Sequence, residues 1–353
     1  MLRTLRQRIT LTDIFIWVIG LSIAGVVIWG TISTLRQGQY LASTWLDLTI
    51  KGLALGGVYA LIAMGYTMVY GILKMINFAH SEVFMSGPFT AVFVALGLAK
   101  SGFLDRQPVI GLAIITLVSM AVSTLIAILL ERIAYRPLRN APRLVPLITA
   151  IGASFFLQYA FKGLFGSGVY GYPEIKSLEH SWTFAGIQIY ETQVVVIIGA
   201  VAMMILLYGI VQWTKIGKAM RAVSEDKEAA ELMGINVDRI IVFTFGLGGA
   251  SAGVAGILYT LLFPVVNFYM GFFPGIKAFT AAVLGGIGNV PGAFLGSIIL
   301  GLLESVGPNL FLTGLGIPSP SQLKDAIAFI VLVLILIFRP TGILGERISQ
   351  DKA

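Results

Sequence analysis

The sequence of 353 residues has no cysteine, only 2 histidines and only 12% charged residues. Without cysteine the chain forms neither disulfides nor thiolate metal sites, and His80 and His180 fit no metal-ligand spacing. A soluble domain carries about 25% charged residues, so this composition excludes a soluble enzyme, a disordered protein and a coiled coil. With 57% hydrophobic residues, the chain is predicted to be an all-α polytopic membrane protein.

Motifs of ATP-hydrolysing and dinucleotide-binding enzymes are missing or lack their structural context. The sequence contains no GxxxxGKS or GxxxxGKT phosphate loop. Residues 166–171 have the GxGxxG spelling, but they follow an apolar helix with no preceding strand, which predicts a loop. We therefore expect a chain that is not an enzyme and holds no cofactor or metal of its own.

Apolar runs long enough for membrane helices follow one another along the chain. A spanning helix needs about 20 residues, and ten runs are present, of which the eighth and ninth are short. These two are expected to form one hairpin whose glycine-rich tip, residues 285–292, contains Gly285, Gly286 and Gly288. The runs lie at about 14–32, 47–73, 82–99, 108–131, 145–166, 192–213, 240–263, 276–288, 291–307 and 324–338.

The basic residues predict which ends of these helices face the cytoplasm. Cytoplasmic loops are rich in Lys and Arg, so the formal net charge of +7 does not indicate a nucleic-acid partner. Both termini and the hairpin tip are then expected on the cytoplasmic side. The basic residues cluster in the amino-terminal arm, two loops and the tail: Arg3, Arg6 and Arg8; Arg132, Arg136, Arg139 and Arg143; Lys215, Lys218, Arg221, Lys227 and Arg239; Arg339, Arg347 and Lys352.

This threading divides the chain into three parts. Residues 1–45 are expected to form a basic arm and an extra transmembrane helix, residues 46–345 the core, and residues 346–353 a cytoplasmic tail. Residues 167–190 form the longest outside loop and are expected to be a docking lip or a short interfacial helix, with Trp182 at the membrane interface.

Glycine accounts for 41 residues. Small residues let membrane helices approach closely, and Gly52 with Gly56 fits this spacing. A Gly-rich helix ends in Asn77-Phe78 and another ends in Asn267-Phe268. On the predicted threading these ends lie on opposite sides of the membrane, as an inverted repeat would place them.

The break between the second and third helices carries unusual polarity. Asn77, His80 and Glu82 lie between apolar runs, with Phe78 and Ser81 beside them. Ionisable groups within a membrane indicate a functional site, here a candidate translocation path. Alternatively, Asn77 or Ser81 caps the next helix and Glu82 favours its positive end.

Two further isolated charges lie in the carboxyl-terminal third of the chain. Lys277 is expected to snorkel to an interface. For Glu304 the sequence leaves open whether the side chain does the same or lines a path.

The second basic loop, residues 214–239, has the pattern of a short helix. Ser224 is placed to cap it, Asp226 and Glu228 would fall in its first turn, and Gly234 is placed to end it. Such a helix between two spans is either a contact for a cytoplasmic partner or a solvated loop helix.

Several longer stretches carry a family resemblance. The chain resembles the LivH-type membrane permease of branched-chain amino acid ABC importers. The stretches are YALIAMGYTMVYG at 59–71, INFAH at 76–80, ERIAYRP at 131–137, GINVDR at 234–239, KAFTAAVLGGIG at 277–288 and RPTGILG at 339–345. The extra amino-terminal helix departs from the shortest members of that family.

The resemblance implies a bacterial inner-membrane permease that joins a second, similar permease, two cytoplasmic ATPases that bind ATP and Mg, and an extracytoplasmic binding protein. Glu228, Ala229 and Ala230, followed by Gly234, resemble the EAA motif that couples such permeases to their ATPases, and Asp226 belongs to the same helix. The implied path passes Asn77 and the glycine hairpin.

Other functions remain open at this point. Close relatives of this permease type resemble importers of urea, short amides and other neutral amino acids. A branched-chain or other neutral amino acid is therefore the expected substrate, and urea or a short amide is the alternative. A self-sufficient transporter coupled to protons through His80, Glu82 or Glu304 is the alternative from another class. A passive channel lacks a filter signature.

Overall fold

The computed structural model describes residues 11–139, 141–142, 144–178, 180–184 and 187–345. The expectations for the basic arm, for Arg143 and for the tail beyond residue 345 lie outside these residues. Within them the ten predicted helices are confirmed, and nine are long and apolar enough to cross a membrane. They are α1 (Leu11–Gln37), α2 (Ala42–Leu73), α3 (His80–Lys100), α5 (Pro108–Leu130), α6 (Leu144–Phe165), α7 (Glu191–Trp213), α10 (Val237–Leu262), α11 (Phe272–Gly285), α12 (Val290–Gly307) and α13 (Lys324–Phe338).

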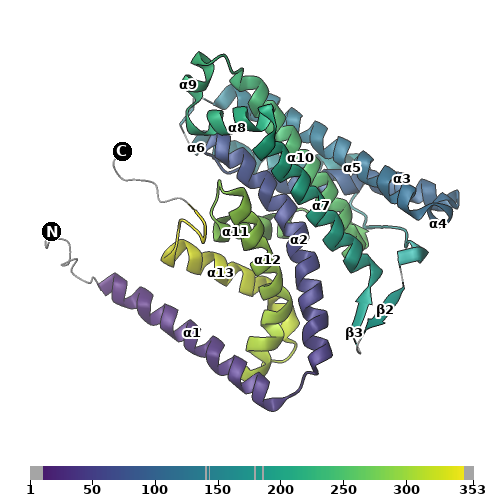
Figure 1. Ribbon diagram of the computed structural model, residues 1–353, viewed down its shortest axis with the longest axis vertical. Coiled ribbons are helices and arrows are strands. Elements are labelled where there is room, and N and C mark those ends of the chain that lie inside the picture. The colour runs from purple at the N-terminus through teal and green to yellow at the C-terminus, as the bar shows by residue number, and fades with distance from the viewer. Residues whose placement is uncertain (1–10, 140, 143, 179, 185–186, 346–353) are drawn as a thin grey trace.

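Helix α2 lies at the centre of the molecule (Figure 1) and packs against α12, α10, α11 and α7. Its close approach to α12 depends on small residues, as the spacing of Gly52 and Gly56 predicts. A Cβ added at Gly56 would lie 2.9 Å from the Ser297 carbonyl oxygen, and one at Gly52 3.0 Å from the Gly301 carbonyl oxygen. Larger residues at either position would therefore push the two helices apart.

The predicted hairpin is formed by α11 and α12. Helix α11 has 14 residues, about 21 Å at the rise of an α-helix, which is shorter than the hydrocarbon layer. Helix α12 continues through a π-helical segment (Pro308–Leu312) and a 3-10 turn (Thr313–Leu315). It therefore runs further than the predicted apolar run, and residues 290–315 are long enough to span.

Helix α1 stands away from the core and contacts it mainly at residues 308–315 (Figure 1). A Cβ at Gly30 would lie 2.1 Å from the Phe311 carbonyl oxygen, so the two backbones touch there. At the other end of α1, Trp17 meets Phe338 edge-on at 5.9 Å between ring centroids. Most of its remaining side chains are exposed.

The two ends of the molecule differ in structure. One end carries two short helices, α8 (Lys215–Glu225) and α9 (Lys227–Leu232). The other carries the hairpin of β2 (Ser181–Phe184) and β3 (Ile187–Tyr190), together with β1 (Tyr170–Gly171) paired to β4 (Val265–Val266). The described part of the outer loop contains short strands and a 3-10 turn at Lys176–Leu178 but no α-helix, so the expected interfacial helix is wrong.

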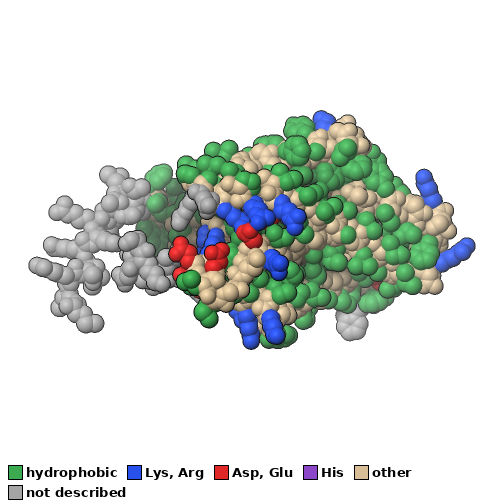
Figure 2. Space-filling view, turned by 90° about the horizontal axis from the view of Figure 1, so that it is seen from above, with side chains coloured by type: hydrophobic (Ala, Val, Ile, Leu, Met, Phe, Trp, Pro, Cys, Tyr) green, Lys and Arg blue, Asp and Glu red, His purple; other side chains and the backbone are tan. Residues whose placement is uncertain are grey.

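Figure 2 looks onto the end that carries α8 and α9. Lys and Arg side chains gather near the middle of this face, beside a smaller group of acidic ones and within a hydrophobic surround. The basic loops of the sequence thus meet at one end of the fold.

Candidate functional site

The polar break connects α2 to α3 inside the protein. Helix α2 ends where Lys74 adopts a left-handed conformation (φ 55°), and α3 begins at His80. Asn77, His80 and Glu82 are all buried. Buried polar groups require partners, so their contacts show what holds the break.

Asn77 is held by Tyr135, whose hydroxyl donates to the Asn77 Oδ1 at 2.5 Å. Tyr135 belongs to a π-helical segment, η1 (Glu131–Tyr135), that continues α5. Ser81 Oγ donates to the Phe78 carbonyl at 2.8 Å. The N-cap of α3 is Ala79, without a side-chain cap, so the alternative that Asn77 or Ser81 caps this helix is wrong.

His80 lies in a space that two glycines provide. A Cβ at Gly65 would lie 2.2 Å from the His80 Nε2, and one at Gly248 3.6 Å from Cε1. The ring of Tyr66 meets the imidazole edge-on at 4.9 Å. Within the described residues Nε2 has no hydrogen-bond partner, although the imidazole is buried.

Glu82 faces a different neighbour, α6. Its Oε1 accepts hydrogen bonds from Gln158 Nε2 at 2.8 Å, Ser154 Oγ at 3.2 Å and Ser81 Oγ at 3.3 Å. Its Oε2 has no partner in the described part of the chain. The break therefore presents an imidazole nitrogen toward α2 and α10 and a carboxylate toward α6.

A second break adjoins the first. The chain between α10 and α11 reaches Gly271, where a Cβ would lie 2.2 Å from the Ser81 carbonyl oxygen. A Cβ added at Gly275, one turn into α11, would lie 2.3 Å from the Ser81 Cβ. On the predicted threading α3 starts from the cytoplasmic side and α11 from the outer side, yet the first turns of these two helices lie next to each other.

The glycine tip of the α11–α12 hairpin is closed by backbone contact. A Cβ at Gly285 would lie 1.9 Å from the Gly292 carbonyl oxygen, and Gly286 and Gly288 have positive φ of 109° and 98°. These conformations suit glycine because it lacks a Cβ.

The chain after α13 runs against this tip. Ile343 N–H donates to the Leu284 carbonyl at 2.8 Å, and Leu344 N–H donates to the Gly285 carbonyl at 2.9 Å. Phe279 of α11 packs against Phe78 of the break, with ring centroids 5.7 Å apart. The hairpin and the polar break are therefore neighbours, as the candidate path requires.

The loop 214–239 contains two helices and not one. Thr214 caps α8 by accepting from the Gly217 N–H at 3.0 Å. The predicted cap Ser224 is wrong, because its hydroxyl donates back to the Arg221 carbonyl within α8. Asp226 caps α9 and accepts from the backbone N–H groups of Glu228 and Ala229.

Gly234 ends α9, as predicted. Its φ is 82°, its N–H donates to the Glu231 carbonyl at 2.9 Å, and the Ile235 N–H donates to the Ala230 carbonyl at 3.0 Å. This pair of bonds is a Schellman motif. Ala230 is buried beneath the helix, whereas Glu228 is exposed.

Two large apolar side chains at the carboxyl end of α9 were not anticipated. Leu232 is 90% exposed and Met233 is 82% exposed. Both lie at the end that carries the basic residues. The sequence Leu232-Met233 directly before Gly234 could have indicated these exposed apolar residues.

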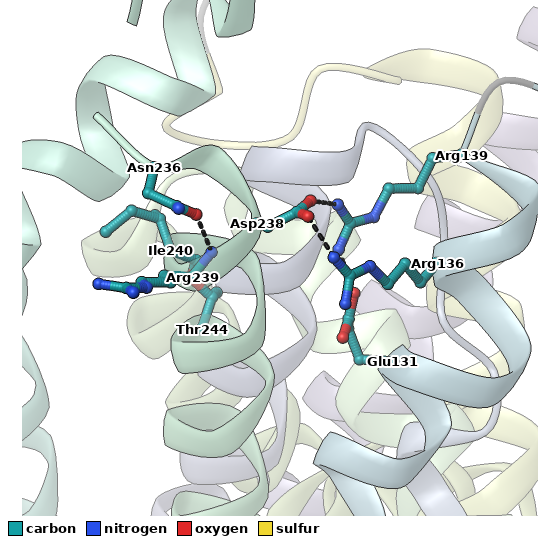
Figure 3. A network of polar contacts seen from close by, with 8 residues as sticks. All are labelled: Glu131, Arg136, Arg139, Asn236, Asp238, Arg239, Ile240 and Thr244. Atoms are coloured by element: carbon teal, nitrogen blue, oxygen red, sulfur yellow. Dashed lines mark hydrogen bonds and ion pairs between the residues drawn. The ribbon is translucent and has the colours of Figure 1, made fainter. Parts of the chain in front are cut away.

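The start of α10 is clamped to η1 by charge (Figure 3). The Asp238 carboxylate pairs with Arg136 and Arg139, and Arg139 also pairs with the fully buried Glu131. Nearby, burial together with Arg139 and Lys74 holds the pKa of Lys227 below its usual range.

A buried charge cluster joins four helices. Lys277 Nζ lies 2.6 Å from both Glu304 Oε1 and Asp325 Oδ1, and the Tyr59 hydroxyl donates to Glu304 Oε2 at 2.9 Å. Lys277 is 5% exposed and Glu304 4%. The prediction that Lys277 snorkels is wrong, because carboxylates from α12 and α13 balance its charge inside the protein. Residues 277, 304 and 325 are too far apart in the sequence for their spacing to predict this ion-pair cluster.

Two hollows lie at opposite ends of the molecule. One of about 300 Å³ is lined by Tyr172, Glu174 and Tyr190 at the β2–β3 end. The other, of about 640 Å³, lies between α5 and α10 at the α8–α9 end. Neither is lined by Asn77 or His80.

This fold, with broken helices and buried ionisable groups, defines a polytopic membrane protein. The family model described as branched-chain amino acid transport system / permease component matches residues 48–336, and the chain belongs to this family. Helix α1 precedes the matched residues.

Individual relatives agree with this family. The chain is 43% identical over 307 residues to the high-affinity branched-chain amino acid transport system permease protein BraD of Pseudomonas aeruginosa, covering 86% of this chain and 96% of that one. It is 40% identical over 306 residues to the permease LivH of Escherichia coli K12, with the same coverage. Among solved structures, an inward-facing metal-chelate type ABC transporter gives a TM-score of 0.45 at 15% identity, covering 91% of this chain and 98% of that one.

Proposed function

We propose that this chain is the permease subunit of an ATP-driven importer of branched-chain amino acids in the bacterial inner membrane. The observation that carries the proposal is the 43% identity to BraD along 96% of that protein's length. The α8–α9 end then faces the cytoplasm, in keeping with its Lys and Arg residues, and the β2–β3 end receives substrate from a binding protein. ATP and Mg are bound by two partner ATPases, and a second, similar permease completes the membrane part.

In this assembly α9 is the contact for an ATPase. Glu228, Ala229, Ala230 and Gly234 carry the family motif, with Asp226 as the cap. The exposed Leu232 and Met233 supply the apolar surface that a docking groove would cover. Burying one such side chain contributes about 1.5–3 kcal/mol.

The proposed translocation path passes the polar break and the hairpin. Asn77, Phe78, His80 and Glu82 belong to the break, with His80 toward α2 and α10 and Glu82 toward α6, and the turn at Gly285, Gly286 and Gly288 belongs to the hairpin beside it. Helix breaks near the midplane are where transporters place their substrate sites. ATP-driven movement of α9 would change which side of this path is open.

The test begins with the full chain purified gently from its own membrane and identification of every co-purifying protein by mass spectrometry. We expect an ATPase with a phosphate loop and a sister permease. Changing Leu232→Ser together with Met233→Ser should remove the ATPase and leave the chain in the membrane. The control is Leu41→Ser, a residue near the opposite end that is 75% exposed, which should retain the ATPase.

Substrate and energy source are tested in liposomes that contain the purified assembly. Uptake of leucine with binding protein and ATP supports the proposal, whereas uptake of urea alone assigns another substrate. A chain that purifies alone and moves solute on a proton gradient would refute the importer and make His80, Glu82 and Glu304 the coupling groups. Replacing Glu228 or Gly234 should abolish uptake, and normal uptake by both variants would remove the coupling role.

A further inference from the structure

The groove between α5 and α10 is polar at one end and apolar at the other. Arg132, Arg136 and Arg239 line its end beside α8 and α9, while Phe243 and Leu247 line its continuation along α10. Along α10 the lining runs from Asp238, which pairs with Arg136 and Arg139, to Ala250, about 18 Å at 1.5 Å per residue. This separation of charge from apolar wall follows the axis of α10, one of the helices long enough to span a membrane.

Two of the three arginines have no acidic partner within the described residues. Arg136 is engaged by Asp238, whose other oxygen binds Arg139. Arg132 and Arg239 make no ion pair or side-chain hydrogen bond there, and both are exposed. Guanidinium groups bind phosphate oxygens through two parallel hydrogen bonds, so the polar end offers a phosphate two guanidinium groups that have no acidic partner in the described part of the chain.

The apolar wall identifies what carries that phosphate. A soluble anion or protein would reach only the arginine end. Ile128, Phe243 and Leu247 continue the groove into the spanning part of both helices, next to Leu125 and Leu129 on the exposed face of α5. An acyl chain would lie along these residues while its headgroup stays with the arginines.

We propose that this groove binds one anionic phospholipid, with the phosphate between Arg132 and Arg239 and an acyl chain along Phe243 and Leu247. Basic pockets between membrane helices bind acidic lipid headgroups by the same chemistry. Such a lipid joins the end of α5 to the start of α10 next to the Asp238 clamp, and so stabilises the segment that follows α9. This role is separate from the proposed transport activity.

The experiment uses the full chain, purified with its partner subunits and stripped of lipid. Phosphatidylglycerol, phosphatidylcholine or inorganic phosphate is added. Native mass spectrometry counts the bound lipid, and thermal unfolding gives the midpoint temperature of the same sample. Phosphatidylglycerol should bind and raise the midpoint, and the other two should not. Arg132→Gln with Arg239→Gln should weaken retention about thirtyfold, at about 1 kcal/mol for each lost arginine. The matched control, Lys215→Gln with Lys218→Gln, removes two exposed charges from the same end and should retain the lipid.

Three outcomes overturn the proposal. An equal shift with inorganic phosphate would show a free-anion site. Equal retention of phosphatidylglycerol and phosphatidylcholine by the unaltered chain would show no headgroup recognition, a result that does not depend on any variant folding. Equal loss in the control pair would show that overall charge, and not the groove, attracts the lipid.

Discussion

Replacing Lys277 by methionine tests whether the buried charge cluster holds α11, α12 and α13 together. The change keeps most of the side-chain volume but removes the ammonium group that lies 2.6 Å from both Glu304 and Asp325. Glu304 then stays buried with only the Tyr59 hydroxyl as partner. Breaking a buried ion pair by removing one member costs about 3–5 kcal/mol.

The two carboxylates respond differently. The side chain of Asp325 is 39% exposed, so water can solvate its charge, and the loss falls mainly on Glu304. Adding Glu304→Gln to Lys277→Met removes the unpaired charge while its amide oxygen still accepts from Tyr59. The double variant should therefore be more stable than Lys277→Met alone, although the second change on its own would be harmful.

The assay is reversible unfolding of the purified protein in mixed micelles, which gives the free energy of unfolding. Lys51→Met is the matched control, because Lys51 pairs with Asp47 at 2.7 Å but its side chain is 48% exposed. Such a surface pair contributes about 0–1 kcal/mol. A Lys277→Met variant no less stable than Lys51→Met, or no recovery in the double variant, would refute the assignment of a stabilising buried cluster.

Two further changes test other contacts. Tyr135→Phe removes the hydroxyl that binds Asn77 and leaves a buried amide oxygen unpaired. The free energy of unfolding should therefore fall by about 1–3 kcal/mol in the same assay. A fall below about 0.5 kcal/mol would mean that water replaces the bond. Gly30→Ala places a Cβ against the Phe311 carbonyl oxygen, whereas Gly25→Ala meets open space. Limited proteolysis of the connection between α1 and α2 should therefore accelerate only in the Gly30 variant, and equal rates would show that α1 does not depend on this crossing.

The helices could be predicted from the sequence because lipid imposes a simple rule. A spanning segment must satisfy its backbone internally and be apolar over about 20 residues, and both conditions are visible in composition. Close packing of two helices can also be predicted from the sequence where small residues recur four positions apart, as Gly52 and Gly56 do. The turn at Gly234 was predictable for a similar reason, since a left-handed helix end favours glycine.

The contacts of single polar residues could not be read in this way. Lys277 resembles a snorkelling lysine until α12 and α13 bring carboxylates to it, and that pairing is set by tertiary packing across long sequence separations. Ser224 and Asp226 are both good caps, so the sequence could not decide between one helix and two. Asn77 is also a good cap, and only the position of Tyr135 shows that its amide is used elsewhere.

The contacts from α9 to the polar break form a short continuous series. Gly234 ends α9, and α10 begins three residues later beside Asp238, whose carboxylate pairs with Arg136 and Arg139. Arg139 binds Glu131 at the start of the segment η1, and η1 ends with Tyr135, which binds Asn77 in the break. A movement of α9 that shifted η1 would thus act directly on the residue that fixes the break. The series is built from ion pairs and one buried hydrogen bond. If α9 is the ATPase contact, Tyr135 and Asn77 are where its motion would first reach the proposed path.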